Sequence, residues 1–171
     1  MPNMKQIITG HNKKILSNNR QSKENTKKCN CRNKENCPLD GKCLISSIVY
    51  EAEVTNKQNN EKHTYIGLTE NTFKSRYTLH KSSFNNKNKR HSTTLSDLVW
   101  KSKEDEIEHD IKWKILSGPI EAYSTTTKNC KLCTEEKLLI LKNSHKKENI
   151  NSRNEINSYC RHRRKHLLIS Q

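Results

Sequence analysis

The seven cysteines of this chain are clustered, and the clustering restricts the possible folds more than any other feature. A single segment of fifteen residues, CNCRNKENCPLDGKC, contains four of them: Cys29, Cys31, Cys37 and Cys43. Four thiolates at such short spacing can form a closed, tetrahedral zinc site of the structural kind. The odd number of cysteines suits a disulfide framework poorly, so we expect metal in preference to disulfides, with scattered reduced thiols as the alternative.

A second group of cysteines lies in the C-terminal third of the chain. Cys130 and Cys133 form a C-x-x-C half-site, which Cys160 and His162 can complete, with His166 as a substitute for the fourth ligand. Hydrophobic residues make up 30% of the chain, too few to bury all 171 residues in one core. Since zinc binding contributes about 10–16 kcal/mol of folding free energy in small modules, two zinc sites would compensate for this deficit.

The charge of the chain favours a polyanionic partner. Lys and Arg number 33 against 18 acidic residues, a formal net charge of +15. Such an excess attracts nucleic acid, although the abundance of Asn and Lys also fits a generally lysine-rich proteome. The sequence contains no apolar run of about 18 residues, and its first residues lack the apolar centre of a signal peptide, so we expect an intracellular protein.

The sequence divides into three parts. Residues 1–28 are polar and basic with little apolar periodicity, and we interpret them as a flexible basic arm or linker. We expect residues 29–44 to form the first zinc knuckle, and residues 45–171 to form the main domain, with a basic C-terminal tail that the second zinc site holds.

Three segments after the knuckle have the pattern of strands. Residues 45–54 (ISSIVYEAEV) and 63–69 (HTYIGLT) contain β-branched and aromatic residues, and a polar turn separates them, which predicts a β-hairpin. Residues 109–116 alternate apolar and polar side chains, which indicates a third, half-buried strand.

Three further segments have helical patterns. Residues 72–85 predict a helix with Glu70, Asn71 or Thr72 as its cap, and it carries Arg76 and His80 on one face, four residues apart. A short helix follows around residues 95–100. The apolar segment 133–142 predicts a third helix, whose buried stripe we expect to consist of Leu132, Leu138 and Leu141, with Glu136 flanking it.

Several residues in this order have the chemistry of phosphodiester hydrolysis. That reaction needs a deprotonated water, neutralisation of the charge on the phosphorane and a stabilised leaving oxygen, usually through a metal ion. The sequence Ile48-Val49-Tyr50, Tyr65-Ile66-Gly67, Arg76-x-x-x-His80, Glu136 and Asn151 resembles the GIY-YIG endonuclease superfamily in residue types and order. Only the first triplet departs from the family pattern, with Ile48 in place of Gly and Val49 in place of Ile, while Tyr50 is retained.

Three flanking segments narrow the resemblance further. CNCRNKENCPLDGKC, KLCTEEKLLIL and CRHRRK are similar to the endonuclease region of Penelope-like retroelements, and the similarity covers about residues 29–168. Such an element also contains a reverse transcriptase, and nothing in these 171 residues has the pattern of a polymerase palm. We therefore expect a fragment or remnant of the element, with a reverse transcriptase domain as a possible partner.

The resemblance implies a small α+β fold, a three-stranded antiparallel sheet flanked by helices, and a role for each residue. Glu136 would hold one divalent ion, usually Mg²⁺, with Glu135 as the alternative ligand. Arg76 would bind the phosphate, and Tyr65 would position the phosphate or the water. Either Tyr50 or His80 would accept the water's proton. Asn151 would add a donor, or tie the Glu136 helix to the catalytic strand.

The sequence therefore predicts a Mg²⁺-dependent DNA endonuclease, located in the nucleus with its target. Eight basic residues are candidates for contacts with the DNA backbone: Arg32, Lys34, Lys74, Lys81, Arg161, Arg163, Arg164 and Lys165. A zinc-stabilised nucleic-acid-binding module without catalysis is the alternative hypothesis. A secreted, cysteine-rich binding protein is disfavoured by the odd cysteine count and the missing signal sequence.

Overall fold

The structure is a computed structural model that describes residues 3–20, 28–120, 130–157 and 160 of the chain. The chain divides into two units, one spanning residues 28–159 and the other formed by residues 1–27 and 160–171. All of the predicted catalytic residues belong to the first unit. No described helix is long and apolar enough to cross a membrane.

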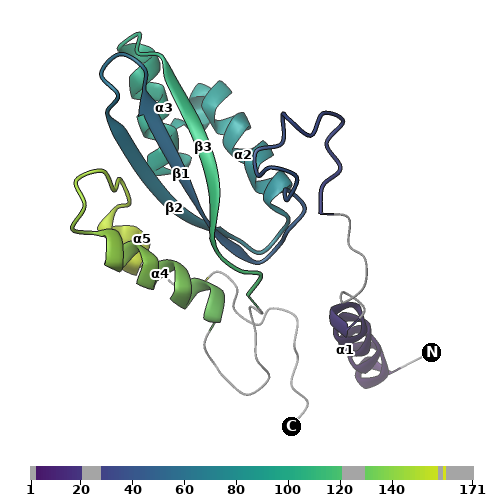
Figure 1. The fold of residues 1–171 in the computed structure, drawn as a ribbon. Helices are drawn as coiled ribbons and strands as arrows, with labels where there is room; N and C mark the ends of the chain where they lie inside the picture. Colours follow the sequence, from purple (N-terminus) through teal and green to yellow (C-terminus); the bar gives the residue numbers. More distant parts are fainter. Residues whose placement is uncertain (1–2, 21–27, 121–129, 158–159, 161–171) are drawn as a thin grey trace. The chain divides into compact units, whose positions relative to one another are not determined.

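The centre of the larger unit is a three-stranded antiparallel sheet (Figure 1). Its strands are β1 (Ile48–Asn56), β2 (Lys62–Thr69) and β3 (His109–Ser117), in the order β2-β1-β3. The polar segment NKQNNEK connects β1 to β2 as the hairpin pattern predicted. The α+β class and the small antiparallel sheet with flanking helices, both expected from the sequence, are confirmed.

The register of the sheet determines which side chains share its buried face. Tyr65 of β2 and Trp113 of β3 both pair with Ala52 of β1, so the three side chains project to the same face. Here they join one hydrophobic cluster, whose fully buried members are Leu39, Ile48, Tyr50, Ala52, Val54, Tyr65, Phe73 and Leu95. The two tyrosines of the predicted site therefore belong to the core face of the sheet.

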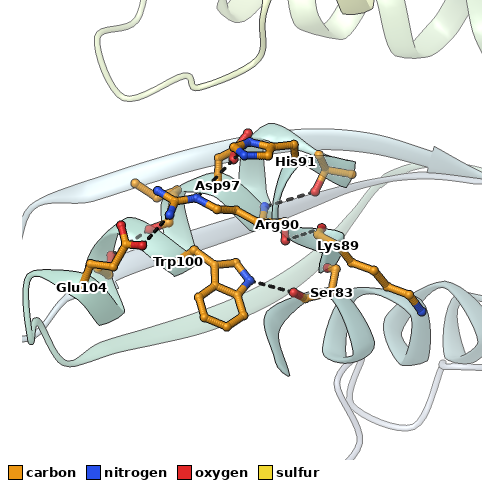
Figure 2. A network of polar contacts seen from close by, with 11 residues as sticks. Ser83, Lys89, Arg90, His91, Asp97, Trp100 and Glu104 are labelled. Carbon is orange, nitrogen blue, oxygen red and sulfur yellow. Dashed lines mark hydrogen bonds and ion pairs between the residues drawn. The ribbon is translucent and has the colours of Figure 1, made fainter. Parts of the chain in front are cut away.

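Two helices joined by a 3₁₀ turn cover this face: α2 (Phe73–Asn85), η2 (Lys87–Ser92) and α3 (Thr94–Glu104). Thr72 caps α2, because its hydroxyl accepts a hydrogen bond from the Ser75 backbone. Figure 2 shows how polar contacts join the three elements. Arg90 of η2 pairs with Glu104 of α3, His91 lies 2.6 Å from Asp97, and the Trp100 indole donates to the Ser83 carbonyl at 2.9 Å. These contacts fix the C-terminal half of α2, which carries His80.

Helix α4 (Lys131–Asn143) packs against β2 and is followed by the short helix α5 (Arg153–Asn157) (Figure 1). The predicted buried stripe of α4 is wrong in two of its three residues, since Leu138 and Leu141 are at least half exposed. The buried face consists of Leu132, Cys133 and Ile140. Glu136 is four residues from both Leu132 and Ile140, so it lies in the middle of this face, where the sequence pattern expected only a flanking position.

The other unit contains helix α1 (Met4–Arg20), in the segment for which the sequence predicted a flexible basic arm or linker. Its start has a capping box, a signal that the apolar pattern does not reveal. The Gln6 backbone N–H donates to the Asn3 side chain at 2.9 Å, and the Gln6 side chain accepts from the Asn3 backbone at 3.1 Å. These reciprocal bonds satisfy two backbone donors and favour a helix in a segment with few apolar residues.

Candidate active site

The hydroxyl of Tyr50 is the centre of a buried polar network. Arg76 donates a hydrogen bond from Nε to the Tyr50 oxygen at 2.9 Å, and His80 Nε2 lies 2.8 Å from the same oxygen. Arg76 and His80 are one turn apart on α2, so the helix presents both to β1. The structure therefore brings together three of the predicted catalytic residues at one atom.

Tyr65 lies next to this network, and Gly67 makes the approach of the two tyrosines possible. Arg76 also hydrogen-bonds to Tyr65, so one guanidinium serves both phenols. A Cβ atom at position 67 would lie 2.8 Å from the Tyr50 hydroxyl oxygen and 2.9 Å from a ring carbon of Tyr65. Because real Cβ atoms do not approach other atoms so closely, any residue larger than glycine would displace a tyrosine.

The protonation of His80 gives the network its direction. Burial, together with the positive charge of Arg76, lowers the pKa of His80 from 6.5 to about 3, so the imidazole is neutral at neutral pH. Burial raises the pKa of Tyr50 despite the nearby Arg76. The Tyr50 hydroxyl thus keeps its proton and accepts from Arg76, and it donates to His80 Nε2 when the imidazole proton is on Nδ1.

Glu136 directs a carboxylate toward the same group of residues. It accepts a hydrogen bond from the backbone of Leu68, on the exposed edge of β2. Burial raises the pKa of Glu136 from 4.5 to about 7, the nearby Glu155 adds to this, and the Leu68 hydrogen bond and Arg76 oppose it. The charge of Glu136 in turn raises the pKa values of Tyr50 and Tyr65. A carboxylate oxygen in this position is a suitable ligand for a hard cation such as Mg²⁺.

Replacing Glu136 by glutamine is expected to stabilise the protein at pH 8 without added Mg²⁺, by about 3 kcal/mol, and to leave its stability at pH 4 unchanged. The folded-state pKa is about 7 and the ordinary value 4.5, so the contribution of Glu136 to stability is complete below pH 4.5 and is lost as the pH rises through 7. Glutamine resembles the protonated acid at every pH. Urea denaturation at both pH values measures the difference, with Glu135→Gln as the control, and an equal effect at the two pH values would contradict it.

Asn151 occupies the edge of β2 with its side-chain amide. Its Oδ1 accepts from the Ile66 N–H and its Nδ2 donates to the Ile66 carbonyl, both at 2.8 Å. Of the two roles predicted for this residue, the contacts correspond to the tie to the catalytic strand. The sequence pattern did not indicate the part that two further residues have in the site. Gly67 entered it only as a member of the YIG motif. Glu155 did not enter it, although the Ser152-x-x-Glu155 spacing is that of a capping box.

The first cysteine group could bind zinc. The sulfur atoms of Cys29 and Cys37 are 3.7 Å apart, and Cys43 lies 3.6 Å from both Cys29 and Cys31. A tetrahedron with metal–sulfur bonds of about 2.3 Å has edges of about 3.8 Å, so the four thiols fit a zinc ion. Burial raises the pKa of Cys37, but hydrogen bonds from the Leu39 and Gly41 backbone and from Cys29 and Cys43 outweigh it and lower this pKa to about 7. Burial raises the pKa of Cys43 to about 12, so a bound zinc ion would have to displace the proton of that thiol.

In the second predicted group, Cys130 and Cys133 form a C-x-x-C pair of thiols that could bind zinc. Cys130 and Cys133 are buried at the start of α4, whereas Cys160 belongs to the other unit, so this complete site stays a prediction. The fourth ligand, His162 or His166, lies outside the described residues.

Four of the predicted DNA-contacting residues can be located in the structure. Lys74 donates to the Asn30 side chain at 2.6 Å, and the Lys81 ammonium lies over the Tyr77 ring. Arg32 and Lys34 belong to the first cysteine segment. The remaining four lie outside the described residues: Arg161, Arg163, Arg164 and Lys165.

Comparisons with known proteins identify no relative. No protein-family model matches the chain, and no curated protein or solved structure matches it. The function must therefore be argued from the chemistry of the site.

Proposed function

We propose that this chain is a Mg²⁺-dependent DNA endonuclease of the GIY-YIG type, derived from a Penelope-like retroelement. The observation that carries the proposal is the network in which Arg76 and His80 both contact the Tyr50 hydroxyl, with the Glu136 carboxylate nearby. A hydrophobic core does not require a guanidinium, an imidazole and a carboxylate around two buried phenols. Their combination suits the hydrolysis of a phosphodiester.

Each residue has a task that agrees with its contacts. Tyr50 accepts the proton of the attacking water and passes its own proton to His80, whose Nε2 lies 2.8 Å away. A bound phosphate would offset the Arg76 charge that, together with burial, lowers the pKa of His80. His80 Nε2 contacts the Tyr50 hydroxyl, so we assign the direct contact with the water to Tyr50 and the role of second proton acceptor to His80. Arg76 has further donors besides Nε with which to hold the phosphate, and Tyr65 orients it.

Glu136 is the residue that would hold Mg²⁺. The fit rests on the donor set, because a mostly buried carboxylate with a raised pKa gains its ionised form when a cation binds beside it. The ion would neutralise the charge that develops on the phosphorane and on the leaving oxygen. Zinc at the two cysteine groups would have only a structural task. A reverse transcriptase partner and a nuclear location complete the proposal.

The burial of the two phenols favours one alternative. Tyr50 is 0% exposed and Tyr65 is 5% exposed, as expected if the network only stabilised a core. The chain would then be a zinc-stabilised module that binds nucleic acid through its net charge of +15 and does not cleave it.

A plasmid-nicking assay separates the two functions. The wild-type protein with Mg²⁺ is expected to convert supercoiled plasmid to the nicked form, and removal of Mg²⁺ from the buffer is expected to stop this. Protein carrying Glu136→Ala, purified in parallel, controls for contaminating nuclease. Retardation of DNA in a gel without any Mg²⁺-dependent nicking would reject the nuclease in favour of the binding module.

A further inference from the structure

Glu155, which no part of the proposed reaction uses, contacts a residue of the candidate site. Its Oε2 atom accepts two hydrogen bonds, from Asn151 Nδ2 at 2.7 Å and from the Ser152 backbone N–H at 2.9 Å. The second bond is the carboxylate half of a capping box at the start of α5, where Glu155 occupies the third helical position. The first bond is not needed for capping, so Glu155 has a partner outside its own helix.

That partner, Asn151, holds the backbone on one side of Tyr65. Strand β2 is at the edge of the sheet, and the Asn151 amide satisfies both free backbone groups of Ile66. On the other side of Tyr65, the backbone of Thr64 bonds to Glu148 and Ile150, at 2.7 and 2.9 Å. Tyr65 therefore lies between two anchored residues on an edge that would otherwise have unpaired N–H and C=O groups.

The Asn151 amide fits Ile66 in only one of its two orientations. Its oxygen must face the Ile66 N–H and its NH₂ group the Ile66 carbonyl, because a rotation of 180° would place donor against donor and acceptor against acceptor. Glu155 favours the correct orientation, since its carboxylate oxygen accepts the second hydrogen of the same NH₂ group. With Glu155 present, the oxygen and both N–H groups of the Asn151 amide have hydrogen-bond partners.

We propose that Glu155 is a positioning residue for the Tyr65 side of the site: its carboxylate orients Asn151, which holds β2 at Ile66. This inference rests on the proposed nuclease function for its effect on rate. It predicts that the geometry of the acceptor oxygen matters more for the rate than the charge of Glu155, although that charge also raises the pKa values of Tyr65 and Glu136.

The variants Glu155→Ala and Glu155→Gln test this distinction. Alanine removes the acceptor, so kcat for plasmid nicking at saturating Mg²⁺ is expected to fall about 10- to 100-fold with little change in KM, as for a misplaced catalytic group. Glutamine keeps an oxygen that can accept both hydrogen bonds, and it is expected to restore kcat to within about threefold of wild type. Glu108→Gln, which removes an exposed acid on the β3 side of the unit, is the matched control and should have no effect.

A second pair of measurements tests the path through Asn151. Asn151→Ala should lower kcat as much as Glu155→Ala, and the double variant should be no slower than either single variant, because both changes break the same connection. Amide hydrogen exchange at Ile66 gives a readout that needs no activity, and it is expected to accelerate in Glu155→Ala and return to the wild-type rate in Glu155→Gln.

The outcomes separate the inference from the proposed function. Absence of cleavage by the wild type would reject the proposed nuclease function but not the positioning role. That role would still be supported by slow Ile66 amide exchange that depends on residue 155. Unchanged exchange in Glu155→Ala would overturn that role. A lower melting temperature of Glu155→Ala with unchanged kcat would show that Glu155 only caps α5. Equal losses of kcat in the alanine and glutamine variants would show that its charge acts directly. Either result would overturn the inference.

Discussion

Replacement of Arg76 by alanine is expected to lower the rate of Mg²⁺-dependent DNA cleavage about 10³-fold, the size of effect found when a charged donor to a developing anion is removed. Arg76 donates to the Tyr50 oxygen at 2.9 Å and also hydrogen-bonds to Tyr65. The variant thus loses the phosphate ligand and the group that holds both phenols in place. The loss should appear in the single-turnover rate at saturating protein, where weaker DNA binding makes no contribution.

A lysine at the same position is expected to recover only part of this loss. It restores the positive charge, but a single ammonium group cannot reproduce the planar set of donors that reaches two phenols and a phosphate. Leu79→Ala is the control on the same helix, because the Leu79 side chain is 59% exposed. Activity of Arg76→Ala within about threefold of wild type would contradict the assignment of Arg76.

Loss of the first zinc site is expected to unfold the larger unit. Cys43→Ser should remove at least one zinc ion per chain and the cooperative thermal transition of this unit, because structural zinc contributes about 10–16 kcal/mol and domains are stable by only about 5–15 kcal/mol. The Cys43 carbonyl accepts from the Lys74 backbone at 2.7 Å, and the Ile45 carbonyl accepts from Phe73 at 2.8 Å. The cysteine segment thus caps the helix that carries Arg76, and its Leu39 belongs to the core.

The measurement is the zinc content per chain together with the melting curve by circular dichroism. About two zinc ions are expected for the wild type, and at most one for Cys43→Ser, because Cys130 and Cys133 belong to the same unit. Glu35→Ala changes an exposed residue of the same segment that offers no thiol, and should retain both zinc and stability. A wild type that keeps its cooperative transition and melting temperature after its zinc has been removed would refute the structural role of the metal.

Local patterns were enough to predict most elements of the larger unit. Alternation in residues 45–54, 63–69 and 109–116 predicted three strands, and the structure contains all three with shifts of a few residues at their ends. The segment 72–85 predicted α2 with Thr72 among its possible caps, and spacing alone placed Arg76 and His80 on one face. Both successes depend on contacts between residues close in sequence, which a periodic pattern records directly.

Helix α4 shows where such patterns fail. Its most apolar stripe contains Leu138 and Leu141, yet both are exposed, because the helix turns its Glu136 face toward β2. An acid in the middle of a buried face reverses the usual relation between hydrophobicity and burial. This face is the buried one because Glu136 accepts a hydrogen bond from the Leu68 backbone at the edge of β2.

Short spacing along the chain was enough to predict three features: the small antiparallel sheet, the position of Arg76 and His80 on one face of α2, and the group of four thiols in residues 29–43. The contacts of Arg76 and His80 with the Tyr50 hydroxyl could be seen only in the tertiary structure. The same holds for the Asn151 amide, which binds Ile66 of β2 from 85 residues further along the chain and is itself bound by Glu155. The reason is physical: a side chain that completes the edge of a sheet is chosen by the position of unpaired backbone groups, and no local pattern encodes that position.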